Sequence, residues 1–259
     1  MKTAIVQHVI REDKLEWNLK HISTLLDQQP GADLYVLSET FATGFMAESA
    51  IEQAEENSQH IFNWMQQQAS HLDAAIAGSM VTKDEEGLLR NRLFFVRPDG
   101  SYDYYDKRHL FSFAGETDAY SAGNRRVVTT WRGVRFLLQI CYDLRFPVFS
   151  RNRSDYDAII YVANWPAIRR EVWKTLLKAR ALENQCFVVG VNIVGNNKGI
   201  EYQGDSIIID SYGHTIAQCT PGMVETTAAE LDMDALERFR RKFPVLVDAD
   251  EYQIMPRLS

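Results

Sequence analysis

Residues 136–147 read FLLQICYDLRFP, a mostly apolar run that reaches a cysteine and then turns polar. Such a run is typical of a buried strand, which places Cys141 just past the strand's carboxyl end. Two other segments follow the same pattern: residues 34–45, LYVLSETFATGF, carry Glu39, and residues 104–111, YYDKRHLF, carry Lys107. Open α/β sheets gather their functional side chains at the carboxyl ends of strands. We therefore expect these three side chains to share one site.

A carboxylate, an ammonium and a thiol form a plausible set for acyl transfer. A thiolate attacks an amide carbonyl well, and Cys141 needs a base or a positive neighbour to form one. Lys107 could favour the thiolate and stabilise an oxyanion, while Glu39 could take the thiol proton and later give it to departing ammonia. Taken singly, a cysteine after a strand is most often a small buried hydrophobe, and Glu39 and Lys107 could be solvated surface groups.

The other reactive side chains suggest neither a metal nor a cofactor. The six histidines are dispersed without metal-ligand spacing, so we expect no metal site. Only His109, two residues after Lys107, is placed near the site. No phosphate-binding loop occurs, and we expect no cofactor. Three cysteines without a CxxC pair indicate reduced thiols and a cytoplasmic protein, in which Cys186 and Cys219 are structural.

Strands and helices alternate at the start and in the middle of the chain, with hairpins between them. We predict strands at 3–10, 34–37, 74–81, 90–96, 102–105, 127–131, 134–140, 158–162, 187–191, 206–210, 215–218 and 226–231. We predict helices from 15 to near 30–31 and at 51–72, 171–185 and 234–241. Asp13 and Glu16 have the spacing of a capping box before the first helix. The pattern indicates an α/β protein with mixed sheets. No linker is visible, so we expect one domain, 1–259, with an extended tail at about 243–259.

The composition of the 259-residue chain favours an ordinary globular protein, with 46% hydrophobic and 24% charged residues. The net charge of −7, from 28 basic and 35 acidic residues, gives no sign of the basic face that a nucleic-acid-binding protein normally needs. No segment reaches the 18 or so consecutive apolar residues of a membrane helix. We therefore expect a small-molecule substrate, with neither nucleic acid nor membrane as partner.

Together the three segments resemble the carbon–nitrogen hydrolase (nitrilase) superfamily, whose signature is a Glu, a Lys and a Cys in this order and these contexts. The resemblance covers nearly the whole chain and includes YVANWP at 161–166, RALEN at 180–184 and GDS at 204–206. It implies that Glu39 is the general base, Lys107 the oxyanion-stabilising cation and Cys141 the nucleophile. It also implies a four-layer α-β-β-α sandwich that forms a homodimer through a helical face, with the C-terminal tail crossing to the partner.

Two further site residues follow from the resemblance. Glu116 matches a supporting glutamate of the family, which orients Lys107 or the attacking water, and the backbone N–H of Tyr142 completes the oxyanion hole. One departure is visible, because Ser38 stands where the family usually has a proline before the first glutamate. That change alters local stiffness and removes no catalytic group.

Within the superfamily, the phrases YDKRHLF, ICYDLRFP and VANWP look like the bacterial ω-amidase branch. This resemblance implies hydrolysis of 2-oxoglutaramate or 2-oxosuccinamate to the keto diacid and ammonia through a thioester, and a link to methionine salvage. A nitrilase, an N-carbamoyl-amino-acid hydrolase or an aliphatic amidase would share the attack by Cys141. The non-enzyme alternative is an inactive relative that binds a metabolite or a protein.

The carboxylate of a keto-acid substrate would need a cation. Arg145, Arg169 and Arg170 lie near the motifs, and the sequence does not distinguish among them; Arg145 could equally form a structural ion pair. Trp165 and Phe113 could wall the pocket or could simply pack in the core.

Overall fold

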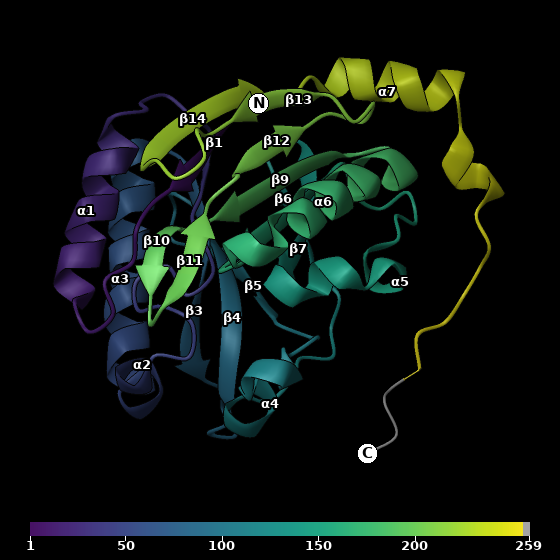
Figure 1. Cartoon of the computed structure of the whole chain (residues 1–259). Helices are drawn as coiled ribbons and strands as arrows, with labels where there is room; N and C mark the ends of the chain where they lie inside the picture. The colour runs from purple at the N-terminus through teal and green to yellow at the C-terminus, as the bar shows by residue number, and fades with distance from the viewer. Residues whose placement is uncertain (256–259) are drawn as a thin grey trace.

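The computed structural model describes residues 1–255 and contains two six-stranded sheets with helices on their outer faces (Figure 1). The first sheet consists, in spatial order, of β14 (Glu225–Glu230), β1 (Lys2–Gln7), β2 (Leu34–Val36), β3 (Ala75–Lys83), β4 (Leu89–Val96) and β5 (Tyr102–Asp106). The second consists of β13 (Thr215–Gln218), β12 (Ile207–Ile209), β9 (Phe187–Asn192), β8 (Ala158–Ala163), β7 (Val134–Ile140) and β6 (Val128–Trp131). A separate hairpin pairs β10 (Val194–Asn197) with β11 (Ile200–Gln203).

The helices fall into a longer and a shorter set. The longer ones are α1 (Leu15–Asp27), α3 (Ala54–Leu72), α6 (Arg170–Asn184) and α7 (Met233–Lys242), and the short ones are α2 (Glu48–Glu52), α4 (Glu116–Ala119) and α5 (Pro147–Ser150). Four 3-10 turns complete the list: η1 (Ser112–Ala114), η2 (Cys141–Arg145), η3 (Ala167–Arg169) and η4 (Val245–Asp248). Helices α1 and α3 pack on the first sheet and α6 packs on the second.

Three apolar clusters hold these layers together. Between the sheets, residues such as Val36 and Phe95 of the first pack against Phe136 and Ile160 of the second. The other two clusters lie between each sheet and its own helices. Burial of apolar surface on both faces of a sheet explains why its central strands are continuously apolar. The predicted four-layer α-β-β-α sandwich is confirmed.

Parallel strands at the centre of each sheet position the site. β2 is parallel to β1 and β3, and β8 is parallel to β7 and β9. Parallel neighbours end at the same edge, so the residues that follow them gather there. Glu39 comes three residues after β2, Cys141 directly after β7 and Asn164 directly after β8.

Most predicted elements agree with the structure to within a few residues, and the main differences concern one helix, one cap and one hairpin. The helix predicted at 51–72 is two helices, which meet at Gln53. The capping box is wrong, because Asp13 has a φ of 58° and its carboxylate accepts a hydrogen bond from the Ser49 hydroxyl, while Glu16 contacts His60. The β10–β11 hairpin was not predicted, since its GNNKGIE stretch lacks alternating apolar residues.

The segment predicted as an extended tail, 243–259, follows α7. It contains the short turn η4, and residues 249–255 have no regular structure, while 256–259 lie outside the described residues. Within residues 1–255, every helix is too short or too polar to cross a lipid bilayer.

Candidate active site

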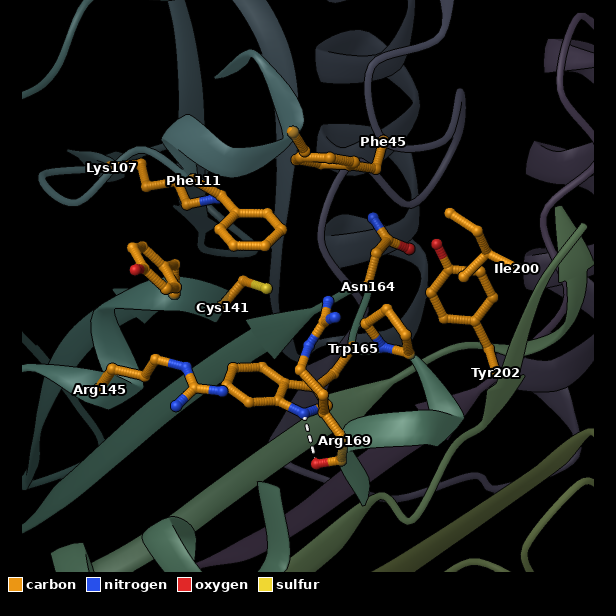
Figure 2. Close-up of a pocket in the computed structure, with 13 residues that line it drawn as sticks. Phe45, Lys107, Phe111, Cys141, Arg145, Asn164, Trp165, Arg169, Ile200 and Tyr202 are labelled. Atoms are coloured by element: carbon orange, nitrogen blue, oxygen red, sulfur yellow. Dashed lines mark hydrogen bonds between the residues drawn. The ribbon is translucent and has the colours of Figure 1, made fainter. Parts of the chain in front are cut away.

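One pocket at the shared strand edge is lined by Cys141 and Lys107 (Figure 2). Glu39 does not line this pocket, and its carboxylate accepts a hydrogen bond from Lys107. Lys107 follows β5 of the first sheet and Cys141 follows β7 of the second. The site therefore lies where the two sheets meet, and it collects the three segments that the sequence singled out. Spacing along the chain alone did not show that these side chains are neighbours.

Lys107 lies between two carboxylates. Its Nζ donates to Oε1 of Glu39 at 2.8 Å and to Oε1 and Oε2 of Glu116 at 2.9 and 2.8 Å. Glu116 also accepts the backbone N–H of Phe111 at 2.6 Å. An ammonium has three donors, so all three of Lys107 are taken. We call the buried set of Glu39, Lys107 and Glu116 the floor of the pocket.

At the floor, burial and the charges of neighbouring groups shift the pKa of Lys107 in opposite directions. Burial by itself lowers the pKa of Lys107, but the charges of Glu116 and Glu39 raise it well above its ordinary value. Burial raises the pKa of Glu116, and the charge of Glu39 raises it further against the opposing effect of Lys107. The floor thus holds two carboxyl groups around one permanent cation, which favours acceptance of a proton.

Cys141 sits at a sharp change of backbone direction. Its φ is 46°, in the left-handed region that non-glycine residues rarely adopt. Burial raises the pKa of the thiol well above its usual value, and the charge of Glu39 adds to this rise while Lys107 opposes it. These surroundings favour the neutral thiol over the thiolate, so the proton must leave for attack. The adjacent Tyr142 also lines the pocket.

The carboxylate of Asp143 holds this turn in place. It accepts hydrogen bonds from the N–H of Ile140 at 2.9 Å, the hydroxyl of Tyr105 at 2.8 Å and the N–H of His109 at 3.0 Å. The His109 ring contacts the same carboxylate and stacks on Phe146. His109 thus lies near the site, as predicted, and it supports the cysteine turn without lining the pocket.

Two arginines stand at the opening. The Arg145 guanidinium lies 5.3 Å from the ring centre of Trp165, and that of Arg169 lies 5.5 Å from the ring centre of Phe111. Trp165 Nε1 donates to the Arg169 carbonyl at 2.9 Å (Figure 2). Neither arginine forms a salt bridge within the described part of the chain, so the ion-pair alternative for Arg145 is not observed there. We call Phe111, Arg145, Trp165 and Arg169 the mouth of the pocket.

Two of the remaining candidates lie elsewhere. Arg170 makes a two-point contact with Asp205, at 3.0 and 2.7 Å, and does not line the pocket. The prediction that Phe113 walls the pocket is wrong, because its side chain is 89% exposed on η1. Phe111 takes that place instead, where its ring packs against Tyr142.

The family model described as carbon-nitrogen hydrolase matches residues 2–241. The chain belongs to the carbon–nitrogen hydrolase family. It is 43% identical to an omega-amidase, YafV, of Yersinia enterocolitica, over 98% of this chain and 99% of that one. It is 32% identical to a 2-oxoglutaramate amidase of Bacillus subtilis, over 94% and 95% of the two chains.

A solved structure has the same fold as this carbon–nitrogen hydrolase. It is a superfamily member from Xanthomonas campestris with an arsenic adduct in its active site. The TM-score is 0.94 at 39% identity, and the match covers 98% of this chain and 99% of that one. The resemblance drawn from the sequence motifs is therefore confirmed, and the chain is an enzyme that hydrolyses carbon–nitrogen bonds.

Three residues of this hydrolase site were not singled out from the sequence. Asn164 donates its backbone N–H to Oε2 of Glu39 at 2.9 Å and its Nδ2 to the Glu39 carbonyl at 2.8 Å. It directly follows β8, so the strand-end rule applied to VANWP could have found it. Tyr202, on the unpredicted hairpin, lines the pocket. Asn91 contacts the floor from near the start of β4, where the pattern gives no signal.

The described residues offer no metal centre in this hydrolase. No group of three or more His, Cys, Asp or Glu side chains between residues 1 and 255 could hold a metal ion. The acidic residues of the floor are instead engaged with Lys107.

Proposed function

We propose that this hydrolase is an ω-amidase that converts 2-oxoglutaramate, or the shorter 2-oxosuccinamate, to the keto diacid and ammonia. Its relatives named omega-amidase and 2-oxoglutaramate amidase support this substrate class. The observation that carries the proposal is a pocket with the Cys141 thiol inside and two arginines at the mouth, together with Glu39 as the carboxylate next to that thiol. The thiol and the carboxylate suit amide cleavage, and the arginines suit a substrate that has a free carboxylate at its other end.

Attack begins with proton transfer from Cys141 to the floor. The S–H bond of Cys141 breaks, Glu39 takes the proton, and the sulfur electron pair forms a bond to the amide carbonyl carbon. The carbonyl oxygen becomes an oxyanion beside Lys107 and the backbone N–H of Tyr142. Protonation of Glu39 weakens its hold on Lys107, and this frees one ammonium proton for the oxyanion.

Collapse of the intermediate breaks the carbon–nitrogen bond. Glu39 returns its proton to the departing nitrogen, and ammonia leaves while the acyl group stays on Cys141 as a thioester. Water then attacks the thioester carbonyl carbon, with Glu39 taking a proton from the water, and the thiolate leaves and recovers that proton. The balance is one amide and one water consumed, with one carboxylic acid and one ammonia released. Glu116 keeps Lys107 oriented throughout.

The arginines of the mouth select the substrate. Guanidinium groups bind carboxylates with two parallel hydrogen bonds. Arg169 is half-buried and Arg145 is exposed, and both line the pocket. A bound keto-acid carboxylate would supply the anion that the described protein does not supply to either arginine. Trp165 and Phe111 would pack on the short carbon chain between the two ends.

The wider setting follows from the same resemblance. We propose a single-domain cytoplasmic enzyme, residues 1–259, that works as a homodimer without a cofactor and clears an amide formed during methionine salvage.

Ammonia release from 2-oxoglutaramate by the wild type and by Cys141→Ala tests the proposal. We expect turnover by the wild type, none by the variant, and a mass increase of one acyl group on wild-type Cys141 in rapidly quenched samples. The matched control is Cys186→Ala, a buried cysteine outside the pocket, which should keep its turnover. Faster cleavage of a nitrile or of an N-carbamoyl amino acid would assign the enzyme to another branch. A wild type that cleaves none of these compounds would indicate an inactive binding relative.

A further inference from the structure

Asn91 touches all three members of the floor although it carries no charge. It lies on β4 and is 1% exposed. Its Nδ2 donates to Oε1 of Glu39 at 2.8 Å and to Oε1 of Glu116 at 3.3 Å. Its backbone carbonyl accepts the N–H of Lys107 at 2.9 Å. One asparagine therefore bridges the two carboxylates and fixes the start of the segment that carries their common cation.

The two carboxylate oxygens of Glu39 differ in the number of hydrogen bonds that they accept. A carboxylate has about four lone-pair sites, two on each oxygen. Oε1 accepts from both Lys107 and Asn91 and is full. Oε2 accepts the backbone N–H of Asn164 and keeps one site open. Among the described protein groups, only Asn91 and Lys107 fill Oε1, and Lys107 must release one bond if it is to meet an oxyanion.

We propose that Asn91 is a positioning residue that occupies Oε1 of Glu39 and so directs the proton of Cys141 to Oε2. The inference rests on the proposed role of Glu39 as base. In this step the S–H bond breaks, an O–H bond forms at Oε2, and the electron pair stays on sulfur for attack. When the amide nitrogen leaves, the proton returns from Oε2. Asn91 also keeps Oε1 occupied while Lys107 turns toward the oxyanion.

The hydrogen bond from Asn91 also stabilises the negative charge of Glu39. The titratable groups that face Glu39 are Lys107, Glu116 and Cys141, with Tyr120 and Tyr202 within range of its charge. Only Lys107 among them is cationic, so a neutral donor on Oε1 offsets part of the repulsion. Loss of a donor to an ionised carboxylate raises its pKa. The acid limb of the pH–rate profile must then move to higher pH.

The test compares Asn91→Leu, of similar volume without donors, and Asn91→Asp, isosteric with an added charge. For Asn91→Leu, we expect kcat/KM on the amide substrate to fall roughly 10- to 100-fold at neutral pH, the range for a hydrogen bond to a charged group, with the acid limb raised by about one pH unit. The kcat/KM of Asn91→Asp should fall further. The matched control is Asn184→Leu, which removes a buried amide at the end of α6, outside the pocket, and should lower Tm without moving the acid limb.

The pH dependence of Cys141 alkylation by iodoacetamide gives a second readout that needs no substrate. We expect the same upward shift of the acid limb in Asn91→Leu. Failure of the ω-amidase proposal would show as a wild type without turnover, and alkylation would still test Asn91. An unmoved acid limb together with a lower Tm in Asn91→Leu would mean that Asn91 has only a structural role. If Asn91→Leu does not fold, Asn91→Ser is measured instead. The same shift of the acid limb in that variant would support the proposal, and its absence would overturn it.

Discussion

The floor and the mouth of the pocket both carry charge, but they use it in opposite ways. At the floor, Lys107 is fully buried and each of its donors meets a carboxylate within 2.9 Å. At the mouth, Arg145 and Arg169 lie over aromatic rings and meet no carboxylate of residues 1–255. A charged group that is already paired within the protein is not available to bind a ligand. The paired groups of the floor can instead exchange protons. Cations without an internal partner leave their binding capacity for an external anion.

The difference follows from solvation. A charge taken out of water must be paired, because its desolvation costs several kcal/mol. The two glutamates meet this requirement for Lys107. Burial, and to a smaller extent the charge of Glu39, raises the pKa of Glu116 and of the Cys141 thiol. The mouth arginines remain partly hydrated, so they tolerate the absence of a partner. Mutations in the two regions should therefore have different effects on stability, kcat and KM.

The largest expected effect is that of Lys107→Met. It leaves two buried carboxylates without a cation, so we expect the free energy of unfolding to fall by roughly 3–5 kcal/mol at neutral pH. Ammonia release should fall more than about a thousandfold. Denaturant unfolding and the ammonia assay measure the two quantities. Lys174→Met, on the exposed Lys174–Glu171 pair, is the control and should change the free energy by less than about 0.5 kcal/mol.

The loss in Lys107→Met should depend on pH. Two adjacent buried carboxyl groups raise each other's pKa, as Glu39 already does for Glu116. A carboxyl group whose pKa is raised in the folded state favours folding below its unfolded pKa of about 4.3, and this contribution is lost as the pH rises. The deficit against wild type should therefore be smaller at about pH 5 than at about pH 8. An equal deficit at both would contradict the two-carboxylate account of the floor.

Substitutions in the mouth should act on KM. For Arg169→Ala and Arg145→Ala we expect the KM for 2-oxoglutaramate to rise roughly 10- to 100-fold, because a charged hydrogen-bond partner is lost, with little change in kcat or Tm. Cleavage of an uncharged amide such as propionamide should not change. Arg170→Ala, which loses a contact with Asp205 outside the pocket, is the control. An equal loss on charged and uncharged amides would show that the arginines do not bind the carboxylate.

The smallest expected effects on the kinetics are those of substitutions at Phe111 and Phe113. Phe111→Ala removes an apolar wall of the mouth and should raise KM by about tenfold, from the transfer free energy of a partly buried ring. Phe113→Ala removes an exposed side chain and should change kcat/KM by less than about twofold. Steady-state kinetics on the same substrate measures both. The reverse order would restore the prediction made from the sequence alone.

Much of this protein could be predicted without its structure. The strand-ending segments around Glu39, Lys107 and Cys141 were visible because a buried strand has a local apolar signature and a reactive side chain interrupts it. The alternation of strands and helices gave the α/β class for the same local reason. The motif contexts then gave the family and, with it, the sandwich. The GNNKGIE hairpin was missed because exposed strands lack that signature.

The relations among the groups required the tertiary structure. The Lys107–Glu39 contact joins residues 68 positions apart, and the Asn164–Glu39 contact joins residues 125 positions apart. Such contacts depend on strand order and on how two sheets stack, which no local pattern encodes. Phe111 and Phe113 look alike in sequence, and only the turn at η1 turns one inward and the other outward. The sequence determined which groups can react, and the fold decided which of them are paired and which are left for a substrate, because pairing is set by distance in space.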